Sequence, residues 1–273
     1  MTTWTTQPVN SLDDPRLAAF AHLTEVDLRR RWEQEHGLFI AEGHLVIERA
    51  VQSGLGLESV LTSPRWLERL GDILGAWCGA VLVADEEMLK RISGFHVHRG
   101  ALAAVRRPPL VPVASLLAGE GPILVLEELV DATNVGLAIR SAVGLGIEAV
   151  LLSPGCADPF YRRAVKSSMG AVLQARWARS ESWTDDLRSL TAVRDLVVLT
   201  PAGELLIDEV LANLHPERVA LLLGSEGPGA SPAALRATAR HARIPMHSGV
   251  DSLNVAAATA VACFALDQAR RSS

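Results

Sequence analysis

With 273 residues, the chain can form one large domain or two ordinary ones, and its 49% hydrophobic and 21% charged residues are typical of a globular protein. The formal net charge of −5 argues against a protein that coats nucleic acid non-specifically. The longest apolar run, at 255–266, is too short to span a bilayer, which needs about 20 residues. The N-terminus has no apolar segment typical of a signal peptide. We therefore expect a cytoplasmic protein without a membrane partner.

The three cysteines, Cys78, Cys156 and Cys263, are far apart in the sequence and odd in number. This spacing matches neither a disulfide framework nor a set of metal ligands. We expect three buried thiols and no metal site.

The first hundred residues predict one compact α/β unit. Residues 1–12 are polar and without periodicity, which predicts a flexible arm. Residues 13–35 predict a helical region, because apolar residues recur at helical spacing from Leu17 to Val26. Strands and helices then alternate, as in an α/β layered domain. The strands are expected at 38–41, 59–62, 80–84 and 101–105, and the helices at 45–52, 65–74 and 86–92.

A proline-rich stretch follows, with Pro108, Pro109, Pro112 and Pro122. Because proline fits neither a central strand nor a helix interior, we place a linker at 108–120. The predicted domains are therefore 1–107 and 121–273.

The second domain predicts a parallel sheet, because its strands are short, continuous apolar runs such as Ile123-Leu-Val-Leu. Strands are expected at 123–126, 149–153, 172–177, 196–200, 219–223 and 241–246, and helices at 134–145, 159–168, 184–193, 232–239 and from Ser252 onward. In open α/β sheets, ligands bind at the carboxyl ends of the strands. The loops that follow these ends, at Asn134, 200–203, 224–229 and 246–254, are therefore the candidate sites.

Three stretches of polar and glycine residues lie in these loops. Gly224-Ser-Glu-Gly-Pro-Gly lets the backbone approach a ligand closely, but it is neither a phosphate-binding Walker loop nor a dinucleotide fingerprint, and Leu223 excludes a nucleophile elbow. Asn134 fits a helix N-cap, and Arg140 is a cation in an otherwise apolar helical turn. Ser252 and Asn254 stand at the predicted start of the last helix. Taken singly, each stretch also fits an ordinary turn or cap.

Taken together, Asn134-x-Gly-x-x-x-Arg140, Gly224-x-Glu226-Gly-x-Gly, and Ile244-Pro-Met followed by Ser252-Leu-Asn254-Val resemble the three motifs of the SpoU (TrmH-like) RNA ribose methyltransferases of the SPOUT superfamily. The resemblance covers residues 123–270. Residues 39–43 and 98–103 resemble the family's N-terminal substrate-binding domain. Arg99 stands where relatives commonly have Gln, and Ala256 where many have Ser.

The resemblance implies a C-terminal SPOUT domain with a parallel sheet and a deep trefoil knot, a smaller N-terminal α/β domain, and a homodimer. It also implies that the protein transfers a methyl group from S-adenosylmethionine (AdoMet) to a ribose 2′-hydroxyl. The residues matching the family's cofactor site are Thr200, Pro201, Ala202, Gly203, Leu223, Gly224, Glu226, Gly227, Ile244, Met246 and Leu253. The residues matching its catalytic positions are Arg140, Asn134, Glu226, Ser252 and Asn254.

Arg140 matches the arginine to which the family assigns activation of the hydroxyl. Because a guanidinium stays protonated in proteins, our hypothesis is that Arg140 holds a substrate phosphate and favours ionisation of the hydroxyl, whose proton leaves to phosphate or water. The remaining polar positions would fix Arg140 and the ribose.

Clustered arginines suit phosphate, and they predict RNA contacts at Arg29, Arg30, Arg31, Arg99, Arg162, Arg163 and Lys166. The resemblance also implies ribosomal RNA as the substrate, since an N-terminal domain of this kind is typical of family members that act on ribosomal RNA; transfer RNA is the alternative. Two other classes stay open at this point: a non-catalytic RNA-binding assembly factor with the same fold, and a small-molecule nucleotide-binding enzyme.

Overall fold

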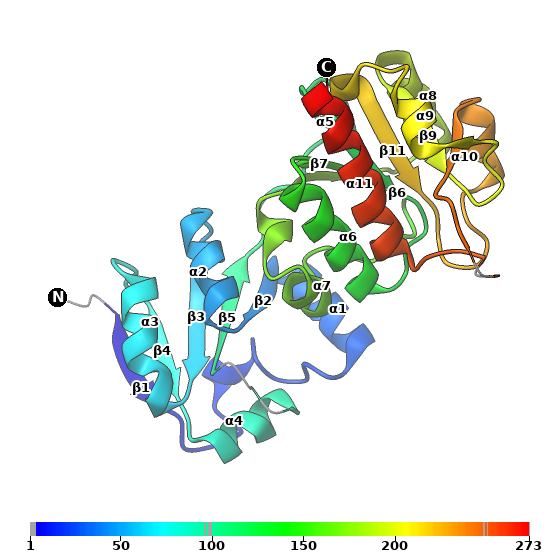
Figure 1. Ribbon diagram of the computed structural model, residues 1–273. Helices are drawn as coiled ribbons and strands as arrows, with labels where there is room; N and C mark the ends of the chain where they lie inside the picture. The colour runs from blue at the N-terminus through cyan, green and yellow to red at the C-terminus, as the bar shows by residue number, and fades with distance from the viewer. Residues whose placement is uncertain (1–3, 96, 98–99, 248, 250, 273) are drawn as a thin grey trace. The chain divides into compact units, whose positions relative to one another are not determined.

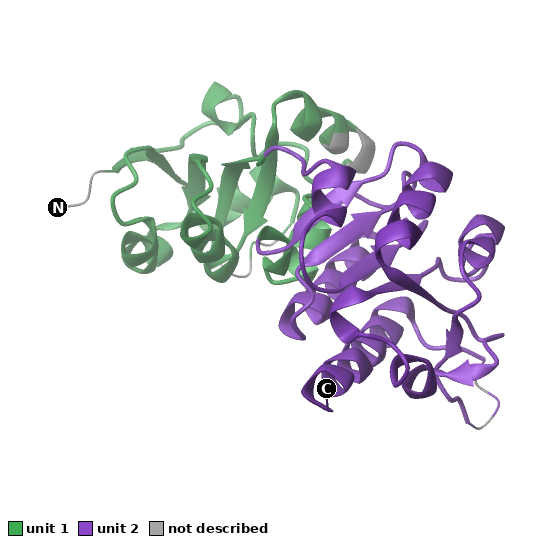
Figure 2. Ribbon diagram, turned by 90° about the horizontal axis from the view of Figure 1, so that it is seen from above, with its two compact units in different colours: residues 1–108, 160–173 green, residues 109–159, 174–273 purple. Residues whose placement is uncertain are grey.

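The computed structural model describes residues 4–95, 97, 100–247, 249 and 251–272. The chain divides into two compact units (Figure 2), one of residues 1–108 and 160–173 and the other of residues 109–159 and 174–273. Residues 160–173, which the sequence had placed in the second domain, group with the first unit. The reason is that α7 (Arg162–Ser167) packs against β2 (Leu38–Glu42).

The first unit is built on a five-stranded mixed sheet in the order β1-β4-β3-β5-β2. Its other strands are β1 (Thr5–Pro8), β3 (Leu57–Thr62), β4 (Ala80–Val83) and β5 (Ala101–Arg106). β1, β4 and β3 run parallel, whereas β5 pairs antiparallel with both β3 and β2. Its other helices are α1 (Val26–Glu35), α2 (His44–Gln52), α3 (Leu67–Leu74) and α4 (Glu86–Ser93).

Two predictions for the N-terminal region are wrong. Part of the expected flexible arm is β1, which adds to the sheet beside β4, with Thr5 opposite Ala80; residues 1–3 lie outside the described residues. The predicted helix at 13–35 is a single 3₁₀ turn, Pro15–Leu17, followed by α1. A left-handed residue, His22 with φ of 55°, interrupts the helical path between them.

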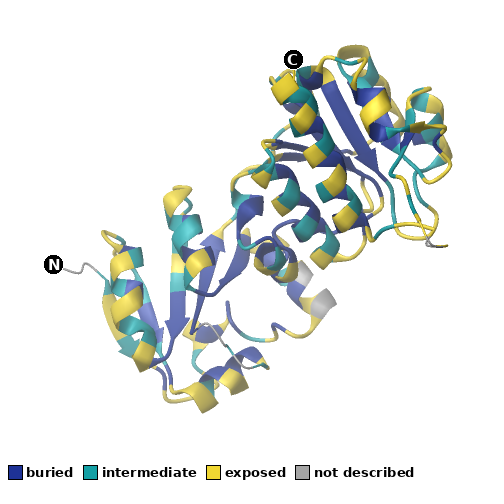
Figure 3. Cartoon of the chain, in the orientation of Figure 1, coloured by how far each residue is buried: buried dark blue, intermediate teal, exposed yellow. Residues whose placement is uncertain are grey.

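The second unit contains a seven-stranded sheet in the order β10-β12-β9-β11-β6-β7-β8, and every pairing is parallel. The strands are β6 (Ile123–Leu126), β7 (Ala149–Leu152), β8 (Arg176–Arg179), β9 (Asp195–Leu199), β10 (Leu205–Leu206), β11 (Val219–Leu223) and β12 (His241–Arg243). All residues of β6, β7 and β11 are buried (Figure 3), which is why these strands read as continuous apolar runs. The predicted α/β class with a parallel sheet is confirmed.

Helices cover both faces of this sheet. They are α5 (Val113–Leu117), α6 (Ala132–Gly144), α8 (Trp183–Val193), α9 (Ile207–Leu211), α10 (Pro232–Ala237) and α11 (Val255–Ser272). Leu116 of α5, Leu190 of α8 and Ala234 of α10 share a core with one face of the strands. α6 packs along α11 on the other face (Figure 1). No helix in the described part of the chain is long and apolar enough to cross a membrane.

Three details of this unit differ from the prediction. The expected strand at 172–177 is a 3₁₀ turn, Ala171–Leu173, followed by β8. The short elements β10 and α9 were not predicted, because two to five residues carry too little periodicity. The predicted linker contains α5, which packs against α8 and β8.

Candidate active site

The loops that follow β6, β9, β11 and β12 meet at one edge of the sheet, because these four strands are neighbours and all run parallel. They are the four loops that the sequence analysis selected as candidate sites. Segments more than 100 residues apart in sequence therefore come together at the carboxyl ends of the strands.

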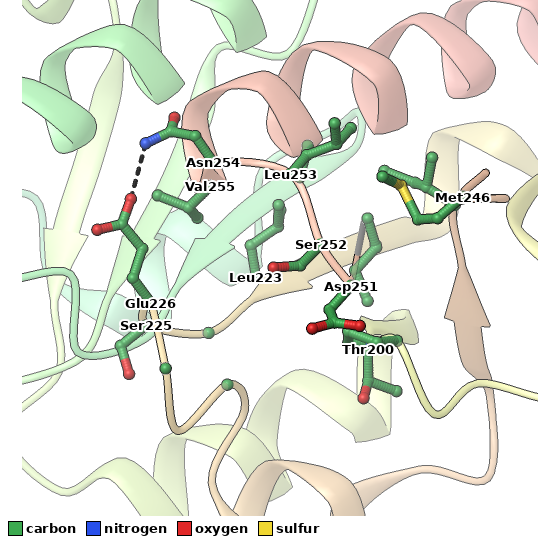
Figure 4. Close-up of a pocket in the computed structure, with 17 residues that line it drawn as sticks. Thr200, Leu223, Ser225, Glu226, Met246, Asp251, Ser252, Leu253, Asn254 and Val255 are labelled. Carbon is green, nitrogen blue, oxygen red and sulfur yellow. Dashed lines mark hydrogen bonds between the residues drawn. The ribbon is translucent and has the colours of Figure 1, made fainter. Parts of the chain in front are cut away.

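A hydrogen-bonded cluster joins the three motifs at this edge. The Glu226 Oε1 atom accepts hydrogen bonds from Asn134 Nδ2 at 2.8 Å and from Asn254 Nδ2 at 2.7 Å. Figure 4 shows the hydrogen bond from Asn254. The two amides also approach each other, with Asn254 Nδ2 3.3 Å from Asn134 Oδ1. One carboxylate thus fixes the start of α6, the loop after β11 and the start of α11 relative to one another.

The sequence misplaced both helix caps in this cluster. Asp131, not Asn134, is the N-cap of α6, and its side chain accepts hydrogen bonds from the backbone N–H groups of Thr133 and Asn134. The last helix begins at Val255 rather than at Ser252, and Asn254 Oδ1 accepts a hydrogen bond from Ala256 N at 2.9 Å. Because Asp131 takes over the capping role, the Asn134 side chain is free to bond Glu226.

The glycine loop after β11 folds back on itself. Gly229 N donates to Ser225 O at 3.0 Å, and Gly227 has a φ of 93°, a conformation that favours glycine. A side chain at Gly224 has no room, because a Cβ atom there would lie 2.2 Å from the carbonyl carbon of Gly229. Glycine is therefore required at position 224 because two backbone segments approach each other closely there.

The other end of the loop is held by Glu127, which follows β6 and is 1% exposed. Its carboxylate accepts hydrogen bonds from Ser231 N at 2.7 Å, from Ser231 Oγ at 2.6 Å and from the indole N–H of Trp183. Sequence reasoning missed this residue, because a single Glu after a strand carries no pattern of its own.

A cavity of about 300 Å³ lies beside the cluster, between the loops after β9, β11 and β12 and the start of α11. Seventeen residues line it (Figure 4). Nine of the eleven predicted cofactor residues are among them: Thr200, Pro201, Leu223, Gly224, Glu226, Gly227, Ile244, Met246 and Leu253. Ser252 and Asn254, predicted as catalytic, also line it.

Two predicted cofactor residues do not line this cavity. Ala202 lines a separate cavity next to β10, and Gly203 packs against the backbone of β12, where a Cβ atom would lie 2.6 Å from the carbonyl carbon of Ala242. Conversely, the sequence analysis assigned no role to six lining residues, although it selected the loops that contain Ser225, Gly229 and Asp251. The six are Leu199, Ser225, Gly229, Asp251, Val255 and Ala258.

The charged residues at the cavity are acidic. Among the lining residues that the structure describes are the carboxylates Glu226 and Asp251, and no Lys, Arg or His. A phosphate bound among these residues would have to be held by backbone N–H groups rather than by cationic side chains.

Arg140 is exposed on α6 and does not line the cavity. Its side chain forms no hydrogen bond or ion pair with any residue that the structure describes, so the expected contacts with the Asn134–Glu226–Asn254 cluster are absent there. A guanidinium without an internal partner is available to an external anion.

The predicted RNA-contacting residues fall into three groups. Arg31, Arg163 and Lys166 are exposed. Arg29 and Arg162 are buried, contrary to the surface role expected of them. Arg99 and the side chain of Arg30 lie outside the described residues.

The two buried arginines neutralise buried carboxylates of the first unit. Arg29 Nε donates to Glu33 Oε1 at 2.8 Å, and Arg162 Nη1 donates to Glu42 Oε2 at 2.6 Å. Burial lowers the pKa of Arg29, and Glu33 offsets this effect. Lys166, whose side chain is half exposed, also bonds Glu42.

The cysteines play no part in the site. Cys156 and Cys263 are buried, whereas Cys78 is exposed, contrary to the prediction of three buried thiols. Burial raises the pKa of the Cys263 thiol to about 12 and also raises that of Cys156, so neither supplies a thiolate at neutral pH.

A glycine-lined cavity at the carboxyl ends of a parallel sheet, with a fixed amide–carboxylate cluster at its rim, defines an α/β protein that binds a small ligand at this edge. Comparison with known proteins is more specific. A model of the SpoU rRNA Methylase family matches residues 121–264. The chain belongs to this family and is a methyltransferase.

The relatives extend the similarity to 94–98% of the chain. An uncharacterized tRNA/rRNA methyltransferase of Mycobacterium bovis is 41% identical over 261 residues, covering 94% of this chain and 90% of the relative. A solved RNA 2′-O ribose methyltransferase is similar with a TM-score of 0.79 at 28% identity, covering 97% of this chain and 100% of the other. An AdoMet-bound rRNA methyltransferase from Sinorhizobium meliloti has a TM-score of 0.81 at 25% identity, with 98% of both chains covered.

Proposed function

We propose that the protein transfers a methyl group from AdoMet to the 2′-hydroxyl of a ribose in ribosomal RNA. The observation that carries this proposal is the Asn134–Glu226–Asn254 cluster, which joins the three family motifs at the rim of the cavity. The similar proteins support both the reaction and the substrate, since they are named as RNA 2′-O ribose and rRNA methyltransferases.

The lining of the cavity suits AdoMet by its chemistry. Apolar side chains such as Leu223, Ile244 and Leu253 would enclose the adenine, and the close backbone of the glycine loop offers hydrogen bonds without charge. The lack of basic lining residues agrees with a nucleoside that carries no phosphate. When bound, AdoMet supplies an electrophilic methyl group on a sulfonium sulfur.

The residues of the chain then position and activate the hydroxyl. The Asn134–Glu226–Asn254 cluster holds the cavity rim rigid, which suits an in-line displacement that depends on alignment. Arg140 holds a phosphate of the RNA and favours ionisation of the hydroxyl. As the oxygen–carbon bond forms and the carbon–sulfur bond breaks, the hydroxyl proton passes to phosphate or water.

The first unit, residues 1–108 together with 160–173, is the proposed RNA-binding domain. Arg31 and Arg163, both exposed, and the half-exposed Lys166 are its candidate phosphate contacts. The second unit is the proposed SPOUT domain, including its trefoil knot.

The protein is further proposed to act as a cytoplasmic homodimer. Val261 and Phe264 support a dimer, since they are 39% and 54% exposed on α11, the helix that packs along α6. Because residues three apart are neighbours on a helix surface, the two side chains form one apolar patch, and exposed apolar patches mark interaction surfaces.

The proposal is tested by incubating the protein with methyl-labelled AdoMet and unmodified ribosomal or transfer RNA. We expect label in ribosomal RNA, recovered after digestion as a 2′-O-methylated nucleoside. Label in transfer RNA alone would overturn the substrate assignment but keep the reaction. AdoMet or RNA binding without any transfer would favour a non-catalytic assembly factor.

Gly224 gives a direct test of the cofactor site. Gly224→Ala would force a Cβ atom against the backbone of Gly229, so we expect the glycine loop to shift and the AdoMet affinity to fall about tenfold or more. Gly144→Ala is the matched control, because nothing lies within 4 Å of a Cβ atom at that position of α6. Calorimetric titration measures the AdoMet affinity of each variant. Equal affinities in the two variants would contradict the assignment of this cavity as the AdoMet site.

A further inference from the structure

Both charged residues that line the cavity are acids. Of the described lining residues, only Glu226 and Asp251 carry a charge. Water screens charges at an open rim, but a carboxylate within a few ångströms of a ligand still affects its affinity.

The two carboxylates differ in whether they have hydrogen-bond partners within the protein. Glu226 already accepts two amide hydrogen bonds through Oε1. The Asp251 side chain forms no hydrogen bond or ion pair with any described residue. It lies on the segment that leads into α11, next to Ser252 (Figure 4). Because Asp251 is exposed at the cavity and has no internal partner, its carboxylate is available to a cationic ligand.

The charge of the proposed cofactor differs from that of its product. AdoMet combines a sulfonium, an ammonium and a carboxylate, and so carries one net positive charge. Loss of the methyl group leaves S-adenosylhomocysteine, whose thioether is neutral and whose net charge is zero. A nearby carboxylate therefore interacts more favourably with the cofactor than with the product.

We propose that Asp251 sets the preference of the cavity for the cationic cofactor over its neutral product. This inference rests on the proposed use of AdoMet. It assigns Asp251 a binding role that none of the three motifs predicted. The consequence is a lower degree of product inhibition than the cavity would show without this carboxylate.

The test measures dissociation constants of both ligands by titration calorimetry. Asp251→Asn keeps the size of the side chain and removes the charge. We expect the dissociation constant of AdoMet to rise about three- to tenfold in this variant. The dissociation constant of S-adenosylhomocysteine is expected to change by less than about twofold. Asp251→Glu, which keeps the charge, is expected to retain the wild-type ratio of the two constants.

The control is Glu204→Gln, which changes the net charge equally but lies in the separate cavity next to β10. We expect it to leave both constants unchanged. In the wild-type protein, added salt should bring the dissociation constants of AdoMet and S-adenosylhomocysteine closer together, because salt screens exposed charges.

Three outcomes would overturn the inference. An equal loss of affinity for both ligands means that Asp251 binds a group they share, such as the ribose hydroxyls or the ammonium. Unchanged affinities in Asp251→Asn mean that the carboxylate does not act on the ligand. Failure of the wild-type protein to bind AdoMet would overturn the proposed cofactor itself. This outcome differs from the first two because it is seen in the wild-type protein, without any substitution of Asp251.

Discussion

Arg140→Ala is expected to lower the rate of methyl transfer to RNA about 100-fold or more, while AdoMet binding changes by less than about twofold. The reason is that Arg140 lies outside the cofactor cavity and has no internal partner among the described residues. The substitution therefore leaves the cofactor cavity unchanged. It removes the cation that acts on the reacting hydroxyl. Single-turnover transfer from labelled AdoMet, together with calorimetric titration, separates these two effects.

Arg140→Lys refines the test. Lysine keeps the charge and loses the planar fork that binds two phosphate oxygens at once, so we expect it to restore only a small part of the rate. Arg236→Ala, an exposed arginine of α10 that also has no described partner, is the matched control and should behave like the wild-type protein. Near-normal transfer by Arg140→Lys would count against a bidentate phosphate clamp.

The sequence predicts the site well where a motif follows a buried strand. β6 and β11 are continuous apolar runs whose boundaries agree with the expectation, so Asn134 and the glycine loop are placed at the correct edge. The caps are misplaced because several residues near each helix start can cap it. Asp131 and Asn254 bond the backbone N–H groups at the two helix starts, and the sequence alone does not show these contacts.

Other features could not be predicted because they depend on tertiary contacts. Arg29 and Arg162 look like surface arginines in sequence, and only the fold shows that each faces a buried carboxylate. Likewise, Glu127 and Asp251 stand in loops without a pattern. The grouping of residues 160–173 with the first unit follows from the packing of α7 against β2, a strand far away in sequence that also carries Glu42, the partner of Arg162.

Glu42→Ala is expected to destabilise the first unit by about 3–5 kcal/mol, because it leaves a buried cation without its partner. The Glu42 side chain is 4% exposed and bonds both Arg162 and Lys166 of α7, and the Arg162 side chain is only 11% exposed. The Arg162 guanidinium also lies 4.3 Å from the ring centroid of Phe95, so it cannot turn to solvent without losing that contact. Urea unfolding measures the loss, and hydrogen exchange is expected to show α7 losing protection first.

The exposed pair of Arg65 and Glu86 provides the control for this prediction. Its side chains are 60% and 61% exposed, so Glu86→Ala should cost less than about 1 kcal/mol. The double variant Glu42→Leu with Arg162→Met should recover much of the stability lost in Glu42→Ala, since it removes the buried charge together with its partner. A stability of Glu42→Ala within about 1 kcal/mol of the wild type would mean that Arg162 finds solvent or another acceptor. Residues 160–173 would then be held to the first unit by the packing of α7 against β2 rather than by charge.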